Sequence, residues 1–327
     1  MSIAPIRDFT SHPGLELSRD ERKVVEALAS RLTRVATGRV DDSAWLDEAR
    51  SASCRLPVRL METLRHYRHD AGRQGFLTIA NLPVGAESLP ATPTMADSVE
   101  RRATVASATA VILAHQLGEV IAYRSEKNGA LVHNIVPVPA LASTQSNGGS
   151  VQLQVHTENA FHPNRPDYVG LLCLRTPDHE LVSTRVCSVL DALPFLTDAD
   201  RTLLHEPRFR TAPPPSFRSA ARSEPHGVLS GDAEDPDLRV DLDTTTGLDR
   251  SAGAALDRLR QAIMDVSADL VLRPGDMAIL DNRIVAHGRS AYSPRYDGTD
   301  RWLHRVFVHL DIRRSRSRRA DNGMVLD

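Results

Sequence analysis

Apolar and polar residues follow two different rhythms along the chain, and the change between them divides the sequence. Up to about residue 120, apolar residues recur at the three- and four-residue spacing of a helix face. Ser18-Arg19-Asp20-Glu21 forms a capping box in front of the first such run. We expect three helices before about residue 68, a fourth over residues 98–117, and one strand at Phe76–Ala80.

From about residue 130 the pattern changes to short apolar or alternating runs separated by turn residues, which is typical of a β core. The runs fall at residues 130–138, 151–155, 168–174, 182–186, 270–272, 277–280 and 302–310. A helix is expected at 252–266, outside this core. Residues 207–231 form a long polar loop, which we expect to act as a lid.

The two rhythms predict one α+β domain over residues 1–327. Its helical support covers about 15–120, and its mainly β core, dressed with flanking helices, covers about 130–312.

Composition excludes several classes of protein. The 327 residues are 41% hydrophobic and 25% charged, with a formal net charge of -2, so nucleic acid is not an expected partner. Three unpatterned cysteines indicate neither a disulfide framework nor a zinc motif. No leader pattern and no apolar run of about 20 residues is present, which predicts a cytoplasmic protein without a membrane partner. The basic run at residues 313–319 is expected to be solvated.

His156-Thr157-Glu158 and the distant His287 carry the clearest candidate chemistry. Residues i and i+2 of a strand point to the same face, so His156 and Glu158 could hold one ion while Thr157 turns away. Two histidines and one carboxylate form the facial set that binds Fe(II) and leaves other positions open for ligands. These three residues are therefore the candidate metal ligands and catalytic residues. The pattern alone is also compatible with structural histidines, because the chain contains 13.

Arg301 lies fourteen residues after His287 and adds a second element to this pattern. A 2-oxo acid that chelates the metal needs a cation for its distal carboxylate, and the guanidinium fork matches a carboxylate. A strand-turn-strand excursion of this length would return Arg301 to the side of the metal. Taken alone, Arg301 could equally form a surface salt bridge.

Four segments resemble the clavaminate-synthase-like branch of the Fe(II)/2-oxoglutarate oxygenases. They are residues 156–163, 165–168, 171–175 and 294–303. Within this branch the chain is similar, from about residue 20 onward, to bacterial amino-acid β-hydroxylases of the asparagine oxygenase and viomycin-type arginine hydroxylase kinds. The resemblance implies a double-stranded β-helix (jelly-roll) core, Fe(II) as cofactor, and 2-oxoglutarate and O2 as co-substrates.

The same resemblance implies roles for individual residues. Arg301 and Thr184 would bind 2-oxoglutarate, and the product would be a 3-hydroxy amino acid for a nonribosomal peptide antibiotic. Related halogenases replace the carboxylate ligand with a small residue, so Glu158 predicts hydroxylation, with desaturation as an open alternative. Arg305, four residues beyond Arg301, resembles the arginine that binds the substrate carboxylate, and Glu126 matches the contact to the α-amino group. Glu158 can assist there with its free oxygen.

The side chain of the substrate is predicted less directly. Asp241 and Asp243 alternate along residues 238–243, which we expect to be a strand that places both carboxylates on one face. Two neighbouring carboxylates repel each other unless a cation joins them, and a guanidinium can satisfy both. Asn147 and Asp241 instead resemble the pair that holds a carboxamide in asparagine oxygenase. We expect a free basic amino acid, arginine ahead of lysine, with L-asparagine as the alternative.

Three rival interpretations stay open from the sequence alone. A jelly-roll binding module would need neither the metal set nor Arg301. A zinc hydrolase could use the same three ligands with a metal-bound water. An amino acid tethered to a carrier protein would lack the free carboxylate that Arg305 is expected to bind. The sequence does not define the oligomeric state.

Overall fold

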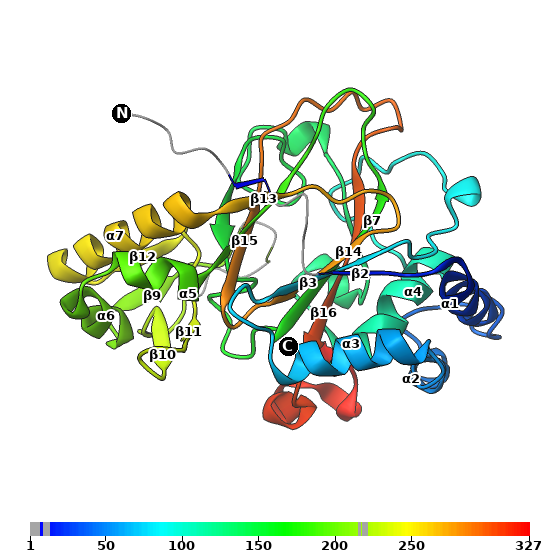
Figure 1. Cartoon of the computed structure of the whole chain (residues 1–327), viewed down its shortest axis with the longest axis horizontal. Coiled ribbons are helices and arrows are strands. Elements are labelled where there is room, and N and C mark those ends of the chain that lie inside the picture. Colours follow the sequence, from blue (N-terminus) through cyan, green and yellow to red (C-terminus); the bar gives the residue numbers. More distant parts are fainter. Residues whose placement is uncertain (1–6, 9–13, 215–216, 218–221) are drawn as a thin grey trace.

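Two β-sheets form the centre of the protein in the computed structural model, which describes residues 7–8, 14–214, 217 and 222–327 (Figure 1). In spatial order the strands of the eight-stranded sheet are β17 (Val325–Leu326), β4 (Glu119–Tyr123), β16 (Trp302–His309), β7 (Tyr168–Arg175), β14 (Met277–Asp281), β3 (Phe76–Ala80) and β2 (Gly14–Glu16), with β5 (His133–Ile135) also paired to β16. Those of the five-stranded sheet are β1 (Arg7–Asp8), β13 (Ala268–Leu270), β8 (Thr184–Ser188), β15 (Val285–Arg289) and β6 (Leu153–His156).

The two sheets share a buried apolar core. Leu171 and Phe307 from the larger sheet lie in one cluster with Val186 from the smaller sheet. Successive side chains of a strand point to opposite faces, and Leu172 belongs to a different buried cluster, which includes the N-terminal helices. The larger sheet is therefore buried on both faces, which explains the nearly continuous apolar run of β7.

Four helices share a buried apolar cluster with the larger sheet (Figure 1): α1 (Arg19–Leu32), α2 (Ser43–Ser53), α3 (Val58–His69) and α4 (Val105–Ala114). Helix α4 packs directly on β7 and β16, and α1 and α2 pack against α4. The predicted capping box is confirmed, because the Ser18 N–H donates to Glu21 Oε2 at 2.8 Å and the Glu21 N–H donates to Ser18 Oγ at 3.2 Å. The fourth helix is shorter than the predicted 98–117. Thr104 caps its N-terminus, and Val99 before it forms a bridge to β5.

The predicted strands of the β core are confirmed in position, most of them with shifted ends, whereas the strand expected over residues 238–243 is absent because β11 ends at Leu238. Phe76–Ala80 matches residue for residue, whereas residues 130–138 narrow to β5 and residues 182–186 move to β8. The short 3-10 helices are η1 (Ala86–Ser88), η2 (Lys127–Gly129), η3 (Pro139–Leu141), η4 (Leu193–Phe195), η5 (Ile312–Arg318) and η6 (Ala320–Asn322). In the described part of the chain, no helix has both the length and the apolar character that a membrane crossing requires.

A smaller lobe with its own apolar core lies beside the five-stranded sheet, at the left of Figure 1. Its helices are α5 (Val189–Ala192), α6 (Asp198–His205) and α7 (Arg250–Val266). Its strand pairs are β9 (Phe209–Thr211) with β12 (Thr245–Gly247), and β10 (Leu229–Gly231) with β11 (Pro236–Leu238). The expectation that residues 207–231 are loop throughout is therefore wrong, because β9 and β10 fall inside this range.

The basic run near the C-terminus is mostly exposed, as expected from its charge, but Ser315 and Arg319 are buried. Most of it forms η5. Arg314 Nη1 lies 2.6 Å from Asp167 Oδ1. The buried Arg319 donates from Nη2 to the Ile312 carbonyl at 2.7 Å. These two arginines hold the tail against the body of the protein.

Candidate active site

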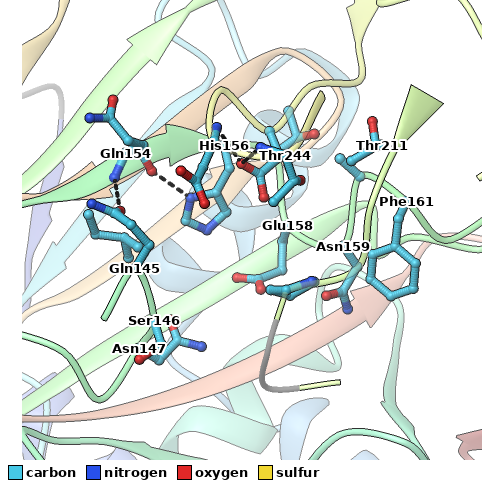
Figure 2. Close-up of a pocket in the computed structure, with 16 residues that line it drawn as sticks. Gln145, Ser146, Asn147, Gln154, His156, Glu158, Asn159, Phe161, Thr211 and Thr244 are labelled. Carbon is cyan, nitrogen blue, oxygen red and sulfur yellow. Dashed lines mark hydrogen bonds between the residues drawn. The ribbon is translucent and has the colours of Figure 1, made fainter. Parts of the chain in front are cut away.

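The His-x-Glu pair and the distant histidine meet on the smaller sheet. β6 and β15 are antiparallel neighbours, and their register places His156 directly opposite His287. The ring centroids are 4.7 Å apart, and His287 Nε2 lies 3.5 Å from Glu158 Oε2. One ligand atom from each of the three residues lies within 4.8 Å of the others. Figure 2 shows His156 and Glu158 at the cavity beside this cluster.

Glu158 reaches the cluster by a different route from the one expected. β6 ends at His156, so the same-face strand argument does not apply to Glu158. Its peptide is instead held by Asn282, which is fully buried. The Glu158 N–H donates to Asn282 Oδ1 at 2.6 Å, and Asn282 Nδ2 donates to the carbonyls of Glu158 at 3.0 Å and Pro166 at 2.8 Å. The loop after β14 therefore sets the position of the carboxylate.

The chemistry of this cluster fits Fe(II). His156 Nδ1 donates to the Gln154 carbonyl at 2.9 Å, an arrangement that leaves Nε2 for a metal. Burial lowers the pKa of His287, which favours the neutral ring that a ligand requires. Glu158 Oε2 is buried without a hydrogen-bond partner among the described residues. Two imidazoles and one carboxylate would hold Fe(II), which when bound supplies the activation of O2 needed for hydroxylation.

A positively charged cavity lies next to the cluster and includes the predicted 2-oxoglutarate contacts. Arg301 immediately precedes β16, and its Nη2 donates to Thr184 Oγ1, at the start of β8, at 3.2 Å. Both residues line a cavity together with Glu158 and His287. Arg301 is 6% exposed, and within the described ranges no carboxylate lies within ion-pair distance of it. Arg301 and Thr184 therefore lie together beside the candidate metal ligands. The Arg301 guanidinium has no carboxylate counter-ion among the described residues.

Arg305 lies in β16 at the centre of a buried charge network. Its Nη1 donates to Glu158 Oε1 at 2.9 Å, and its Nη2 donates to Glu126 Oε1 at 2.5 Å and to His133 Nδ1 at 2.8 Å. Burial raises the pKa of Glu126, and the Arg305 charge opposes this shift. Burial also holds the pKa of His133 well below its usual value, so its ring is neutral and can accept from Arg305. The two predicted substrate residues, Arg305 and Glu126, are therefore in direct contact.

The three residues expected at the side-chain end of the substrate line a neighbouring cavity, but not as expected. Asn147, Asp241 and Asp243 all border it, together with His156 and Glu158. Figure 2 labels Asn147, His156 and Glu158 at this cavity. Asp241 forms an isolated bridge to His156 and begins a turn. Its Oδ1 accepts from the N–H groups of Asp243 at 2.8 Å and Thr244 at 3.2 Å. Asp243 is exposed in that turn, so the prediction of two carboxylates on one strand face is wrong.

Phe217, within the expected lid segment, is buried against aromatic rings near Glu126. Its ring centroid lies 4.7 Å from that of Phe161 and 5.7 Å from that of Tyr123, and Phe217 forms an isolated bridge to Glu126. The neighbouring residues 215–216 and 218–221 lie outside the described residues. The closing motion of a lid stays a prediction.

Asn282 and His133 contribute to the site but were not identified from the sequence. Asn282 follows a strand, where asparagine is common in turns. The Glu158 peptide that it holds lies 124 residues away in the sequence, so no local pattern indicates this role. His133 faces Arg305 across the β5–β16 pair, a register that no local pattern reveals. Arg289 was also missed, although its i+2 spacing from His287 places both on one strand face.

The two-sheet core and the cluster of His156, Glu158 and His287 beside a buried arginine define the protein as an Fe(II)/2-oxoglutarate-dependent oxygenase. The chain belongs to the family described as taurine catabolism dioxygenase TauD, TfdA family, whose model matches residues 48–307. It is 44% identical to an L-asparagine oxygenase from Streptomyces coelicolor over 311 residues, which cover 95% of this chain and 93% of that protein.

Two solved structures are similar over nearly the whole chain. Asparagine oxygenase with Fe(II), 2S,3S-3-hydroxyasparagine and succinate has a TM-score of 0.94 at 44% identity, covering 96% of this chain and 99% of the other. The non-heme iron oxygenase OrfP with Fe, succinate and (3S)-hydroxy-L-Arg has a TM-score of 0.87 at 31% identity, covering 97% of this chain and 100% of the other. The predicted double-stranded β-helix, Fe(II) cofactor and 2-oxoglutarate co-substrate are confirmed, and the protein is an amino-acid hydroxylase.

Proposed function

We propose that the protein hydroxylates free L-asparagine at C3. In this reaction 2-oxoglutarate and O2 are consumed. One oxygen atom of O2 is inserted into the C3–H bond, the other is incorporated into succinate, and CO2 is released. The greater similarity to asparagine oxygenase, at 44% identity against 31% for OrfP, supports this alternative over the basic substrate that Asp241 and Asp243 had predicted.

The observation that carries the proposal is the turn at Asp241. A guanidinium side chain calls for two carboxylates on one face, whereas Asp243 projects from an exposed turn. Burial and the nearby Asp241 charge also raise the pKa of Asp243. Asp241 Oδ1 is used by the turn itself, and Oδ2 has no partner among the described residues. Asp241 Oδ2 can accept one N–H of the substrate's side-chain amide. Asn147, which lines the same cavity, can donate to the oxygen of that amide.

The other end of the site suits a free amino acid. Arg305 can bind an α-carboxylate, and Glu126 Oε2 is buried without a partner among the described residues. A buried carboxylate oxygen without a donor is costly, and the α-ammonium of a zwitterion would satisfy it. Because a substrate tethered to a carrier protein has no free carboxylate, this pair favours the free amino acid.

Arg301 and Thr184 would hold the distal carboxylate of 2-oxoglutarate, so that its oxo-acid end faces the metal ligands. Phe217 and Phe161 would exclude water from the amino-acid side. These residues would therefore bind 2-oxoglutarate, orient it toward the metal, or exclude water from the amino-acid substrate.

A panel of the twenty free L-amino acids, incubated with Fe(II) and 2-oxoglutarate and then exposed to air, tests the substrate. Mass spectrometry should detect a +16 shift on asparagine with matching succinate. Asp241→Ala should lower kcat/KM for asparagine by about 100-fold, the scale of a lost buried polar contact. Asp243→Ala, the matched control two residues away, should change it by less than about threefold.

The other outcomes are equally informative. A shift on arginine or lysine that Asp243→Ala abolishes would refute the asparagine proposal. A loss of 2 mass units from asparagine would identify a desaturase. Succinate formed with no altered amino acid would contradict the free substrate and indicate a tethered one.

A further inference from the structure

Arg289 is a second buried arginine in the co-substrate cavity. It lies on β15 two residues after His287 and is 4% exposed. The β15–β8 register places it directly opposite Thr184. Arg301 donates to the Thr184 hydroxyl, and Arg289, Arg301 and Thr184 all line one cavity.

The contacts of Arg289 leave its positive charge unbalanced. Its Nη2 donates to the Val151 carbonyl at 2.8 Å and its Nη1 to the Asn147 carbonyl at 3.4 Å. Its guanidinium carbon lies 5.0 Å from the Tyr292 ring centroid. Nε is buried and has no hydrogen-bond partner among the described residues. No carboxylate of the described chain lies within ion-pair distance of Arg289.

Two adjacent buried cations without a counter-ion are unfavourable unless an anion joins them. Arg305, by contrast, is balanced by two carboxylates of the protein. The missing counter-ion must therefore come from a ligand.

We propose that Arg289 is a second cationic contact for the distal carboxylate of 2-oxoglutarate, acting together with Arg301 in the same cavity. Nε supplies the free donor, while the two Nη groups hold the loop that carries Asn147. The distal carboxylate would thus be bound by two guanidinium groups and one hydroxyl.

Binding measurements without turnover test this assignment. Anaerobic titration calorimetry of the Fe(II)-loaded protein compares 2-oxoglutarate with 2-oxovalerate, which has the same oxo-acid end and a methyl group in place of the distal carboxylate. Arg289→Met should weaken 2-oxoglutarate by about 10- to 100-fold, or about 1.4 to 2.8 kcal/mol. Its affinity for 2-oxovalerate should stay within about twofold, so discrimination between the two acids falls. Arg301→Met is the positive control.

Arg185→Met is the matched negative control. Arg185 neighbours Thr184 on β8 but points to the other face, where it pairs with Asp269 at 3.4 Å. Its loss should leave discrimination unchanged. Arg289→Lys keeps the charge without the fork, so it should retain most of the discrimination and serves if the Met variant does not fold.

Several results would overturn the assignment. Equal weakening of both acids by Arg289→Met would mean that Arg289 only holds the loop. Unchanged binding of both, or lost discrimination in a folded Lys variant, would exclude a charge contact. Equal affinity of the wild-type protein for both acids would exclude any site for the distal carboxylate. Because no amino acid is present, each result is independent of the asparagine proposal.

Discussion

Replacing Asn282 with alanine tests how the carboxylate ligand is positioned. Asn282 makes three buried side-chain hydrogen bonds, two of them to the peptide groups of Glu158 itself. Glu158 lies beyond the end of β6, so no ladder hydrogen bond replaces them. Without Asn282 the Glu158 backbone would gain freedom, and the three metal ligands would no longer be held in one arrangement.

The expected size of the effect follows from these contacts. A buried hydrogen bond contributes about 0.5 to 1.5 kcal/mol, so losing three should lower the free energy of unfolding by about 1.5 to 4.5 kcal/mol. Removing a residue that orients a metal ligand typically weakens metal binding by about 10- to 100-fold. We expect both effects in Asn282→Ala.

Urea denaturation and anaerobic Fe(II) titration measure the two effects separately. Asn134→Ala is the matched control, because Asn134 is also buried and also makes three side-chain hydrogen bonds, to Ser98, Glu100 and Trp302. None of its partners is a candidate metal ligand. The control should lose similar stability and keep its Fe(II) affinity.

Unchanged Fe(II) affinity in a folded Asn282→Ala variant would refute this reasoning, since the Glu158 backbone would then be held by something else. Equal loss of Fe(II) affinity in Asn134→Ala would refute it as well. Metal binding would in that case follow overall stability and not the specific contact.

Three further predictions concern other parts of the site and the core. His133→Phe removes an acceptor from Arg305 and should raise KM for the amino acid by about tenfold, with KM for 2-oxoglutarate unchanged; parallel changes in both would contradict it. Burial lowers the pKa of His304 to about 3 from 6.5, so as the pH falls below 6.5 the unfolded chain takes up a proton that the folded chain does not. Between pH 7.5 and pH 5 the wild-type protein should lose about 2 kcal/mol more stability in urea than His304→Leu; equal losses would exclude this source. Fe(II) at about 100 times its Kd should stabilise the protein by about 2.7 kcal/mol, and a chelator or Glu158→Ala should abolish the gain; stabilisation that persists in the variant would place the metal elsewhere.

A few widely spaced residues in the sequence predicted which side chains lie together in the structure. A strand-turn-strand excursion between His287 and Arg301 was expected to return the arginine to the metal, and Arg301 does lie beside Thr184 in the same cavity. His287 lies on β15 in the five-stranded sheet, and Arg301 lies immediately before β16 in the eight-stranded sheet. Their proximity therefore follows from the packing of the two sheets and not from strand periodicity. The α+β class followed from the change in hydrophobic periodicity near residue 130.

The errors arose where a short polar segment adopted a turn and not a strand. Asp241 and Asp243 alternate with Val240 and Leu242 as in a strand, but an Asp side chain can also accept from the backbone N–H groups two and three residues further on and so form a turn. Here the turn prevailed, since Asp241 Oδ1 accepts two such N–H groups. Glu158 shows the same limit, because the residue that holds it is distant in sequence. Local patterns contain no information on such pairings.

Charge balance connects these observations with the choice of substrate. We compare the arginines and carboxylates that line the two cavities, together with Glu126, which pairs with the lining residue Arg305. Among the described residues, and without the exposed Asp243, the two kinds are equal in number. They are Arg289, Arg301 and Arg305 against Glu126, Glu158 and Asp241. Fe(II) and the 2-oxoglutarate dianion also cancel, so a zwitterion with an uncharged side chain leaves the site neutral. A bound arginine or lysine would add one positive charge that only Asp243 could balance, from an exposed turn. An uncompensated buried charge costs several kcal/mol, so the charge distribution favours asparagine over a basic amino acid.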